Sequence, residues 1–96
     1  MPEKRGRISG RHDMHRVMFY GLSTCVWCKR TRRLLEDENV AFEFVYVDLL
    51  EGEEKQAVEA QMCEYNPKES FPTIVIDGEH CIVGFKPDEI KKALEL

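Results

Sequence analysis

Two cysteines separated by two residues, Cys25 and Cys28, are the side chains of this 96-residue chain best suited to chemistry. Thiols three positions apart on a helix are neighbours, so they can close a disulfide with little backbone movement. The first turn of a helix presents unpaired N–H groups and the positive end of its dipole, which favours a thiolate over a thiol. At such a helix start, Cys25 is the candidate nucleophile and Cys28 the partner that resolves a mixed disulfide.

The residues around this pair predict a strand that passes directly into a helix. The apolar run from Val17 to Tyr20 is typical of a buried strand, and we expect that strand over about residues 16–20. After the pair, Thr31 and Leu35 share the helical face of Cys28, which predicts a helix over about residues 26–38 that stops at Asn39. The two cysteines therefore belong where the strand meets the helix.

The rest of the chain predicts an alternation of strands and helices. An aromatic and β-branched run should form a second strand, parallel to the first because a helical crossover joins them. A helix that ends at Asn66-Pro67 follows, and Asp77-Gly78 is a hairpin signal between two further strands. We expect these elements at about residues 41–47, 52–64, 74–76 and 80–83, with a last helix opening at Lys86–Glu89. The order β-α-β-α-β-β-α describes an α/β domain with a four-stranded mixed sheet and three flanking helices.

Composition restricts the classes of partner. A net charge of −4 gives no reason to expect nucleic acid or an anionic membrane as a partner. The longest apolar runs are only a few residues, so no segment is expected to span a bilayer, and no apolar stretch that would indicate a signal peptide follows the early basic residues. We therefore expect a cytoplasmic protein, a setting in which a C-x-x-C pair indicates redox chemistry more often than a structural disulfide. We also expect a monomer.

Residues 1–15 are polar, basic and glycine-containing, without hydrophobic periodicity. We interpret them as a flexible basic arm that precedes a domain of residues 16–96. His12 and His15 in this segment are either metal ligands or, more simply, solvated histidines of a tail.

A second motif, Phe71-Pro72-Thr73, opens a strand that the hairpin places inside the sheet. Position alone favours a trans proline. With the helix-start C-x-x-C before this motif and Gly84 after the return strand, the sequence over about residues 16–96 resembles the thioredoxin-fold family, and most of all its glutaredoxin-like branch. The resemblance implies a sheet of order 2-1-3-4 and a cis Pro72 beside the cysteines. It also implies that the backbone of Phe71 pairs with a bound peptide or glutathione.

The sequence departs from typical glutaredoxins in ways that bear on the electron source. Typical glutaredoxins carry C-P-Y-C, whereas Val26-Trp27 lies between the two cysteines here. After the last strand they carry Gly-Gly and then a Ser/Asp-Asp pair, whereas this chain has a single Gly84 followed by Phe85-Lys86-Pro87-Asp88. The polar cradle for glutathione is thus mostly lost, and this run looks more like the glutaredoxin-like electron donors of ribonucleotide reductase. The resemblance implies no tightly bound cofactor, with either glutathione or a thioredoxin reductase and NADPH system as the electron source.

The function expected from the residues and the resemblance together is cytosolic dithiol–disulfide oxidoreduction of protein or small-molecule disulfides. Cys25 and Cys28 would be catalytic. We interpret Trp27 as an apolar contact for peptide substrates. By resemblance, the other candidates for substrate contact are Phe71, Pro72, Thr73, Gly84 and Phe85.

Three alternatives remain open. A structural zinc site needs four ligands, usually in two short pairs, whereas Cys63 and Cys81 are single and far apart, so both are more simply small buried residues or a regulatory pair. An iron–sulfur cluster held between two subunits is disfavoured by the bulky Val26-Trp27. A non-catalytic binding domain that uses the same groove is the third alternative. We therefore expect no metal site.

Overall fold

A computed structural model of the chain describes residues 3–96, which form five strands and three α-helices. The strands are β1 (Arg5–Ile8), β2 (Val17–Gly21), β3 (Phe42–Tyr46), β4 (Thr73–Ile76) and β5 (His80–Val83). The helices are α1 (Val26–Asp37), α2 (Gly52–Tyr65) and α3 (Pro87–Ala93), and a short 3-10 helix, η1 (Val47–Leu49), follows β3. Apart from β1 and η1, every element lies within a few residues of its predicted position.

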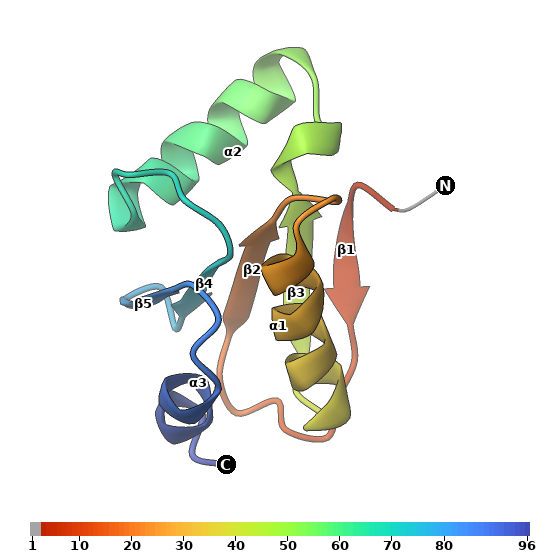
Figure 1. Cartoon of the computed structure of the whole chain (residues 1–96), viewed down its shortest axis with the longest axis vertical. Helices are drawn as coiled ribbons and strands as arrows, with labels where there is room; N and C mark the ends of the chain where they lie inside the picture. Colours follow the sequence, from red (N-terminus) through yellow and green to blue (C-terminus); the bar gives the residue numbers. More distant parts are fainter. Residues whose placement is uncertain (1–2) are drawn as a thin grey trace.

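The five strands form one sheet of order β1-β3-β2-β4-β5 (Figure 1). β2 and β3 are parallel, as expected for strands joined by a helix, while β4 runs antiparallel to β2 and β5 antiparallel to β4. Without β1, this is the predicted four-stranded mixed sheet in its predicted order. Among residues 3–96, none of the helices combines the length and the apolar character that a membrane crossing requires.

The prediction of a flexible arm over residues 1–15 is wrong for most of that segment; residues 1–2 lie outside the described residues. β1 pairs antiparallel with β3, from Arg5 opposite Val45 to Ile8 opposite Phe42, and so covers what would otherwise be an open sheet edge. The chain then returns beside the end of α1, where the His12 N–H donates to the Asn39 carbonyl over 2.9 Å. This region is a structural part of the sheet rather than a tail.

Local sequence signals account for the ends of the elements. Asn39, just after α1, adopts a φ of +58°, a left-handed conformation that commonly terminates helices. Asp77 and Gly78 have φ values of +55° and +70°, the paired positive angles of a tight hairpin turn, as the Asp-Gly dipeptide predicted. Pro87 occupies the first turn of α3, where its missing N–H costs nothing.

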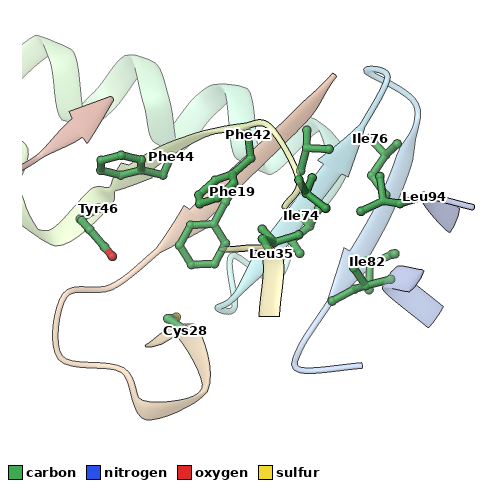
Figure 2. Packing of buried hydrophobic residues seen from close by; sticks show 13 residues of the cluster. Phe19, Cys28, Leu35, Phe42, Phe44, Tyr46, Ile74, Ile76, Ile82 and Leu94 are labelled. Carbon is green, nitrogen blue, oxygen red and sulfur yellow. The ribbon is translucent and has the colours of Figure 1, made fainter. Parts of the chain in front are cut away.

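The sheet buries a different set of side chains on each face. On one face, strand residues pack against Cys28 and Leu35 of α1 and against Ile90 and Leu94 at α3. Figure 2 shows the aromatic rings of Phe19, Phe42 and Phe44 in this cluster. On the other face, Tyr20, Val45 and Val75 pack against Val58 and Met62 of α2. The C-x-x-C helix is therefore anchored to the sheet by the first cluster.

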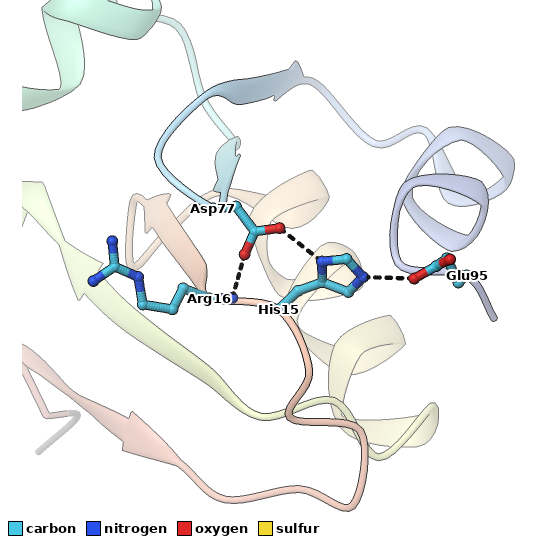
Figure 3. A network of polar contacts seen from close by, with 4 residues as sticks. All are labelled: His15, Arg16, Asp77 and Glu95. Atoms are coloured by element: carbon cyan, nitrogen blue, oxygen red, sulfur yellow. Dashed lines mark hydrogen bonds and ion pairs between the residues drawn. The ribbon is translucent and has the colours of Figure 1, made fainter.

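His15 links three segments that are distant in sequence (Figure 3). Its Nδ1 lies 2.7 Å from an Asp77 carboxylate oxygen in the β4–β5 turn, and its Nε2 lies 3.0 Å from a Glu95 carboxylate oxygen after α3. Only a protonated imidazole donates from both nitrogens, and these two hydrogen bonds raise the pKa of His15 above its usual 6.5. These contacts favour the protonated form of His15, which is a structural link rather than a solvated tail histidine.

Candidate active site

Cys25 caps the N-terminus of α1. Its backbone is extended, with φ −87° and ψ 120°, and its Sγ accepts a hydrogen bond from the Cys28 N–H over 3.2 Å. A side chain at this position normally carries oxygen, and here sulfur satisfies one of the unpaired N–H groups of the first turn. The positive end of the helix and a directed N–H donor both favour negative charge on this sulfur.

Cys28 is the shielded member of the pair. Its side chain has no exposed surface, whereas Cys25 is partly exposed, and both thiols are free. Burial raises the pKa of Cys28 well above its usual range, and a hydrogen bond between the two thiol groups acts in the same direction. The two sulfurs therefore differ. The Cys25 sulfur is accessible and accepts a backbone hydrogen bond, whereas the Cys28 thiol is buried and resists ionisation.

The second motif contains a cis peptide bond between Phe71 and Pro72, as the resemblance implied. The Gly84 N–H donates to the Pro72 carbonyl over 2.8 Å, which ties this bend to the end of β5. Phe71 is partly exposed and packs against the same hydrophobic cluster as Cys25. Within residues 3–96 the Phe71 backbone makes no hydrogen bond to another backbone group, so its polar groups remain open for pairing.

Thr73 lies beside this bend, but its side chain is fully buried. Its hydroxyl donates to the Ser70 carbonyl over 2.7 Å and accepts from the Asn66 side-chain amide over 3.0 Å. These bonds fix the loop between α2 and β4. Because its side chain is buried, Thr73 supports the bend in this structure, and its predicted role in substrate binding stays a prediction.

Two aromatic residues that the sequence analysis named separately as substrate contacts, Trp27 and Phe85, contact each other beside the C-x-x-C pair. Trp27, 53% exposed, stacks on Phe85 with ring centroids 5.8 Å apart. The guanidinium of Arg30 lies 5.0 Å from the Trp27 ring centroid, within cation–π range. Gly84, with a φ of +88°, supports the turn that brings Phe85 to Trp27. The structure thus brings together Trp27 and Phe85, which are more than fifty residues apart.

Asp48, in η1 just after β3, is a residue of this region that the sequence analysis did not identify. Its carboxylate accepts from the Ser23 N–H over 2.9 Å and from the Ser23 hydroxyl over 2.5 Å. Ser23 lies in the loop that carries Cys25. The predicted parallel pairing of β2 and β3 could have indicated this contact. The residues after the carboxyl ends of these two strands meet at one edge of the sheet.

The two remaining cysteines lie outside this region. Cys63 is on α2 and Cys81 on β5, opposite Val75, and both are partly exposed rather than fully buried. Burial raises the pKa of Cys81 above its usual range. Within residues 3–96, no three His, Cys, Asp or Glu side chains come together in a way that could hold a metal ion.

Comparisons with known proteins agree with this arrangement. The sequence model of the glutaredoxin family matches residues 17–81. A protein of Clostridium pasteurianum, described as an uncharacterized glutaredoxin-like 8.6 kDa protein in the rubredoxin operon, is 37% identical over 82% of this chain and 97% of its own length. The Escherichia coli glutaredoxin-like protein NrdH is 32% identical over 80% of this chain and 86% of its own.

Solved structures extend the likeness to the N-terminal strand. The crystal structure of Methanosarcina acetivorans methanoredoxin superposes with a TM-score of 0.91 at 49% identity. The superposition covers 97% of this chain and 98% of that one. A match of this extent includes residues before position 17, so the segment that forms β1 has a counterpart there.

Proposed function

The chain belongs to the glutaredoxin family of thiol–disulfide oxidoreductases, and from that premise we propose that it reduces protein disulfides through a two-thiol cycle at Cys25 and Cys28. One observation carries the proposal. Cys25 caps α1 with its sulfur 3.2 Å from the Cys28 N–H, while the Cys28 thiol is buried beneath it. This asymmetry supports a different role for each sulfur.

In the first step the Cys25 thiolate attacks one sulfur of the substrate disulfide. The S–S bond of the substrate breaks, and its second sulfur leaves as a thiolate that takes a proton from water. A mixed disulfide between Cys25 and the substrate remains. The helix N-terminus supports this step because it stabilises the attacking thiolate, and the partial exposure of Cys25 gives the substrate access.

In the second step Cys28 loses its proton and attacks the Cys25 sulfur. The mixed disulfide breaks, the substrate leaves as its second thiol, and Cys25 and Cys28 form a disulfide. The raised pKa of Cys28 keeps it protonated before substrate arrives, so Cys25 rather than Cys28 makes the first attack. Two electrons from a reductant then restore both thiols.

The substrate is proposed to lie against the surface formed by Trp27, Phe85 and Phe71. Trp27 and Phe85 offer a flat aromatic contact beside Cys25, and the open backbone of Phe71 can pair with an extended substrate segment. Pro72 and Gly84 shape this surface through the bond between them. An aromatic wall of this kind suits a peptide segment better than the charged termini of glutathione.

We further propose that a protein reductase supplies the electrons more readily than glutathione does. Phe85 and Lys86 occupy the turn after β5 where typical glutaredoxins carry their polar cradle, and the E. coli relative is itself named a glutaredoxin-like NrdH protein. The proposed setting is a monomer in the cytoplasm, where a dithiol of this kind stays reduced.

The cycle is tested by separate substitutions of the two cysteines, assayed on a protein disulfide such as insulin with dithiothreitol as the electron source. In a separate reaction without dithiothreitol, Cys28→Ser should accumulate a covalent complex with the substrate, visible on non-reducing gels and by mass spectrometry, because nothing resolves the mixed disulfide until a thiol is added. Cys25→Ser should lose exchange by at least about a hundredfold. Full activity of Cys25→Ser, or equal trapping by both variants, would exclude the assignment.

A further inference from the structure

Asp48 is placed to influence the thiol pair without touching a substrate. It lies in η1, two residues after the last residue of β3, at the same sheet edge as the loop between β2 and α1. Its two carboxylate oxygens receive separate hydrogen bonds from one residue of that loop, the Ser23 N–H at 2.9 Å and the Ser23 hydroxyl at 2.5 Å. Bonds to a carboxylate are among the stronger hydrogen bonds in proteins, so this pair of contacts fixes Ser23.

Fixing Ser23 also fixes the approach to Cys25. The Cys25 N–H donates to the Leu22 carbonyl over 3.2 Å, so the loop closes as a short turn immediately before α1. Ser23 lies inside this turn, two positions before the reactive sulfur. The Asp48 carboxylate thus connects η1, which follows the inner strand β3, to the turn that leads into Cys25.

From this geometry we propose that Asp48 is a positioning residue for disulfide exchange, which holds the Cys25 loop through Ser23 and also places a negative charge that disfavours the thiolate form of the pair. The inference rests on the proposed two-thiol cycle and deepens it. Asp48 is exposed and makes no ion pair within residues 3–96, so its charge is not neutralised locally. The same charge contributes to the raised pKa of Cys28.

The charge has a predictable consequence for the redox equilibrium. A disulfide carries no charge, whereas the dithiol form can ionise, so a nearby carboxylate destabilises only the reduced state when it ionises. Asp48 should therefore shift the equilibrium toward the disulfide and make the pair a stronger reductant. An amide at this position would keep a hydrogen-bond acceptor for Ser23 but remove the charge.

Two matched variants separate the two roles. Asp48→Asn removes the charge and keeps an acceptor, whereas Ser23→Ala removes one hydrogen bond and keeps the charge. The equilibrium constant is measured in buffers of reduced and oxidised dithiothreitol, with fluorescence of the single tryptophan, Trp27, as the readout. We expect Asp48→Asn to shift the equilibrium on the order of threefold toward the dithiol, and Ser23→Ala to leave it unchanged while slowing insulin reduction.

The outcomes distinguish this inference from the proposed cycle. An unchanged equilibrium constant in Asp48→Asn, or equal shifts in both variants, would overturn the charge role of Asp48. An unchanged rate in Ser23→Ala would overturn the positioning role. Neither result affects trapping by Cys28→Ser, which tests the cycle itself. Circular dichroism and a denaturation midpoint confirm that each variant is folded.

Discussion

The Cys25 sulfur has two roles. It caps the N-terminus of α1 by accepting a hydrogen bond from the Cys28 N–H, and it is also the proposed nucleophile. N-terminal caps are usually Ser, Thr, Asp or Asn, whose oxygen accepts from the second or third N–H of the helix. A thiol accepts less strongly than a hydroxyl, and a thiolate more strongly. The cap and the proposed nucleophile are therefore the same atom, so a substitution of Cys25 affects both the first turn of α1 and the proposed exchange.

This dual role predicts how two small substitutions differ in stability. Cys25→Ser retains an acceptor at the cap and should unfold with a free energy within about 0.5 kcal/mol of the parent, whereas Cys25→Ala loses the cap and should cost about 1 kcal/mol. Urea denaturation of the reduced proteins at neutral pH measures both. Equal stability of the two variants would mean that the sulfur contributes nothing as a cap.

At the scale of the residue, the sequence predicted the position of Cys25 and Cys28 in the fold better than the contacts around them. The C-x-x-C lies where an apolar strand meets a helical pattern, so local periodicity alone placed both cysteines. The contact between Asp48 and Ser23 depends on the pairing of β2 with β3, which is a tertiary fact. The stack of Trp27 on Phe85 similarly depends on how the segment between β5 and α3 passes beside the start of α1.

At the scale of elements, strands and helices with strong periodicity were predicted closely, and β1 was missed. Its four residues alternate between outward Arg5 and Arg7 and inward Gly6 and Ile8, so the period of two is present but only one side chain is apolar. A pattern this short gains its stability from the edge of β3 rather than from its own residues. Local sequence could not show that this edge was available.

Gly10 offers a direct test of the β1 region. A Cβ added there would lie 2.5 Å from the Asn39 carbonyl oxygen and 2.5 Å from the Val40 carbonyl carbon, which are backbone atoms that cannot rotate away. Gly10→Ala should therefore lower the free energy of unfolding by about 1–3 kcal/mol, as other overpacking substitutions do. Arg11→Ala, at the exposed next position, is the matched control and should have little effect.

Chemical denaturation of both variants measures this difference. The thiol pair lies at the other end of β2 from this return, so insulin reduction by the folded Gly10→Ala protein should be unchanged. If Gly10→Ala and Arg11→Ala were equally stable, the close approach of residue 10 to the end of α1 would not exist in solution.

At the scale of the whole molecule, His15 joins the N-terminal return, the β4–β5 turn and the C-terminus. The Arg16 N–H also donates to Asp77, over 2.8 Å, so Asp77 receives bonds from two adjacent residues (Figure 3). Together, chiefly through His15, these bonds lower the pKa of Asp77 below its usual value of 3.8. The same contacts therefore favour the protonated form of His15 and the ionised form of Asp77.

The sign of each shift defines the pH window in which the network stabilises the fold. The raised pKa of His15 means that its contribution is complete below pH 6.5 and is lost as the pH rises through the higher pKa of the folded state. The lowered pKa of Asp77 means that its contribution is complete above pH 3.8 and is lost as the pH falls through the lower folded value. The network should therefore contribute most between about pH 4 and pH 6.5.

Comparison of the parent with His15→Gln tests this window. The difference in unfolding free energy should be greatest near pH 5.5 and should shrink steadily toward pH 9, because neutral His15 can donate to only one of its two carboxylates. His12→Gln is the matched control, since His12 is exposed and bonds through its backbone, so its substitution leaves the contacts of His15 with Asp77 and Glu95 in place. A His15→Gln difference that stayed constant from pH 5.5 to pH 9 would show that the imidazole is not held as a cation between Asp77 and Glu95.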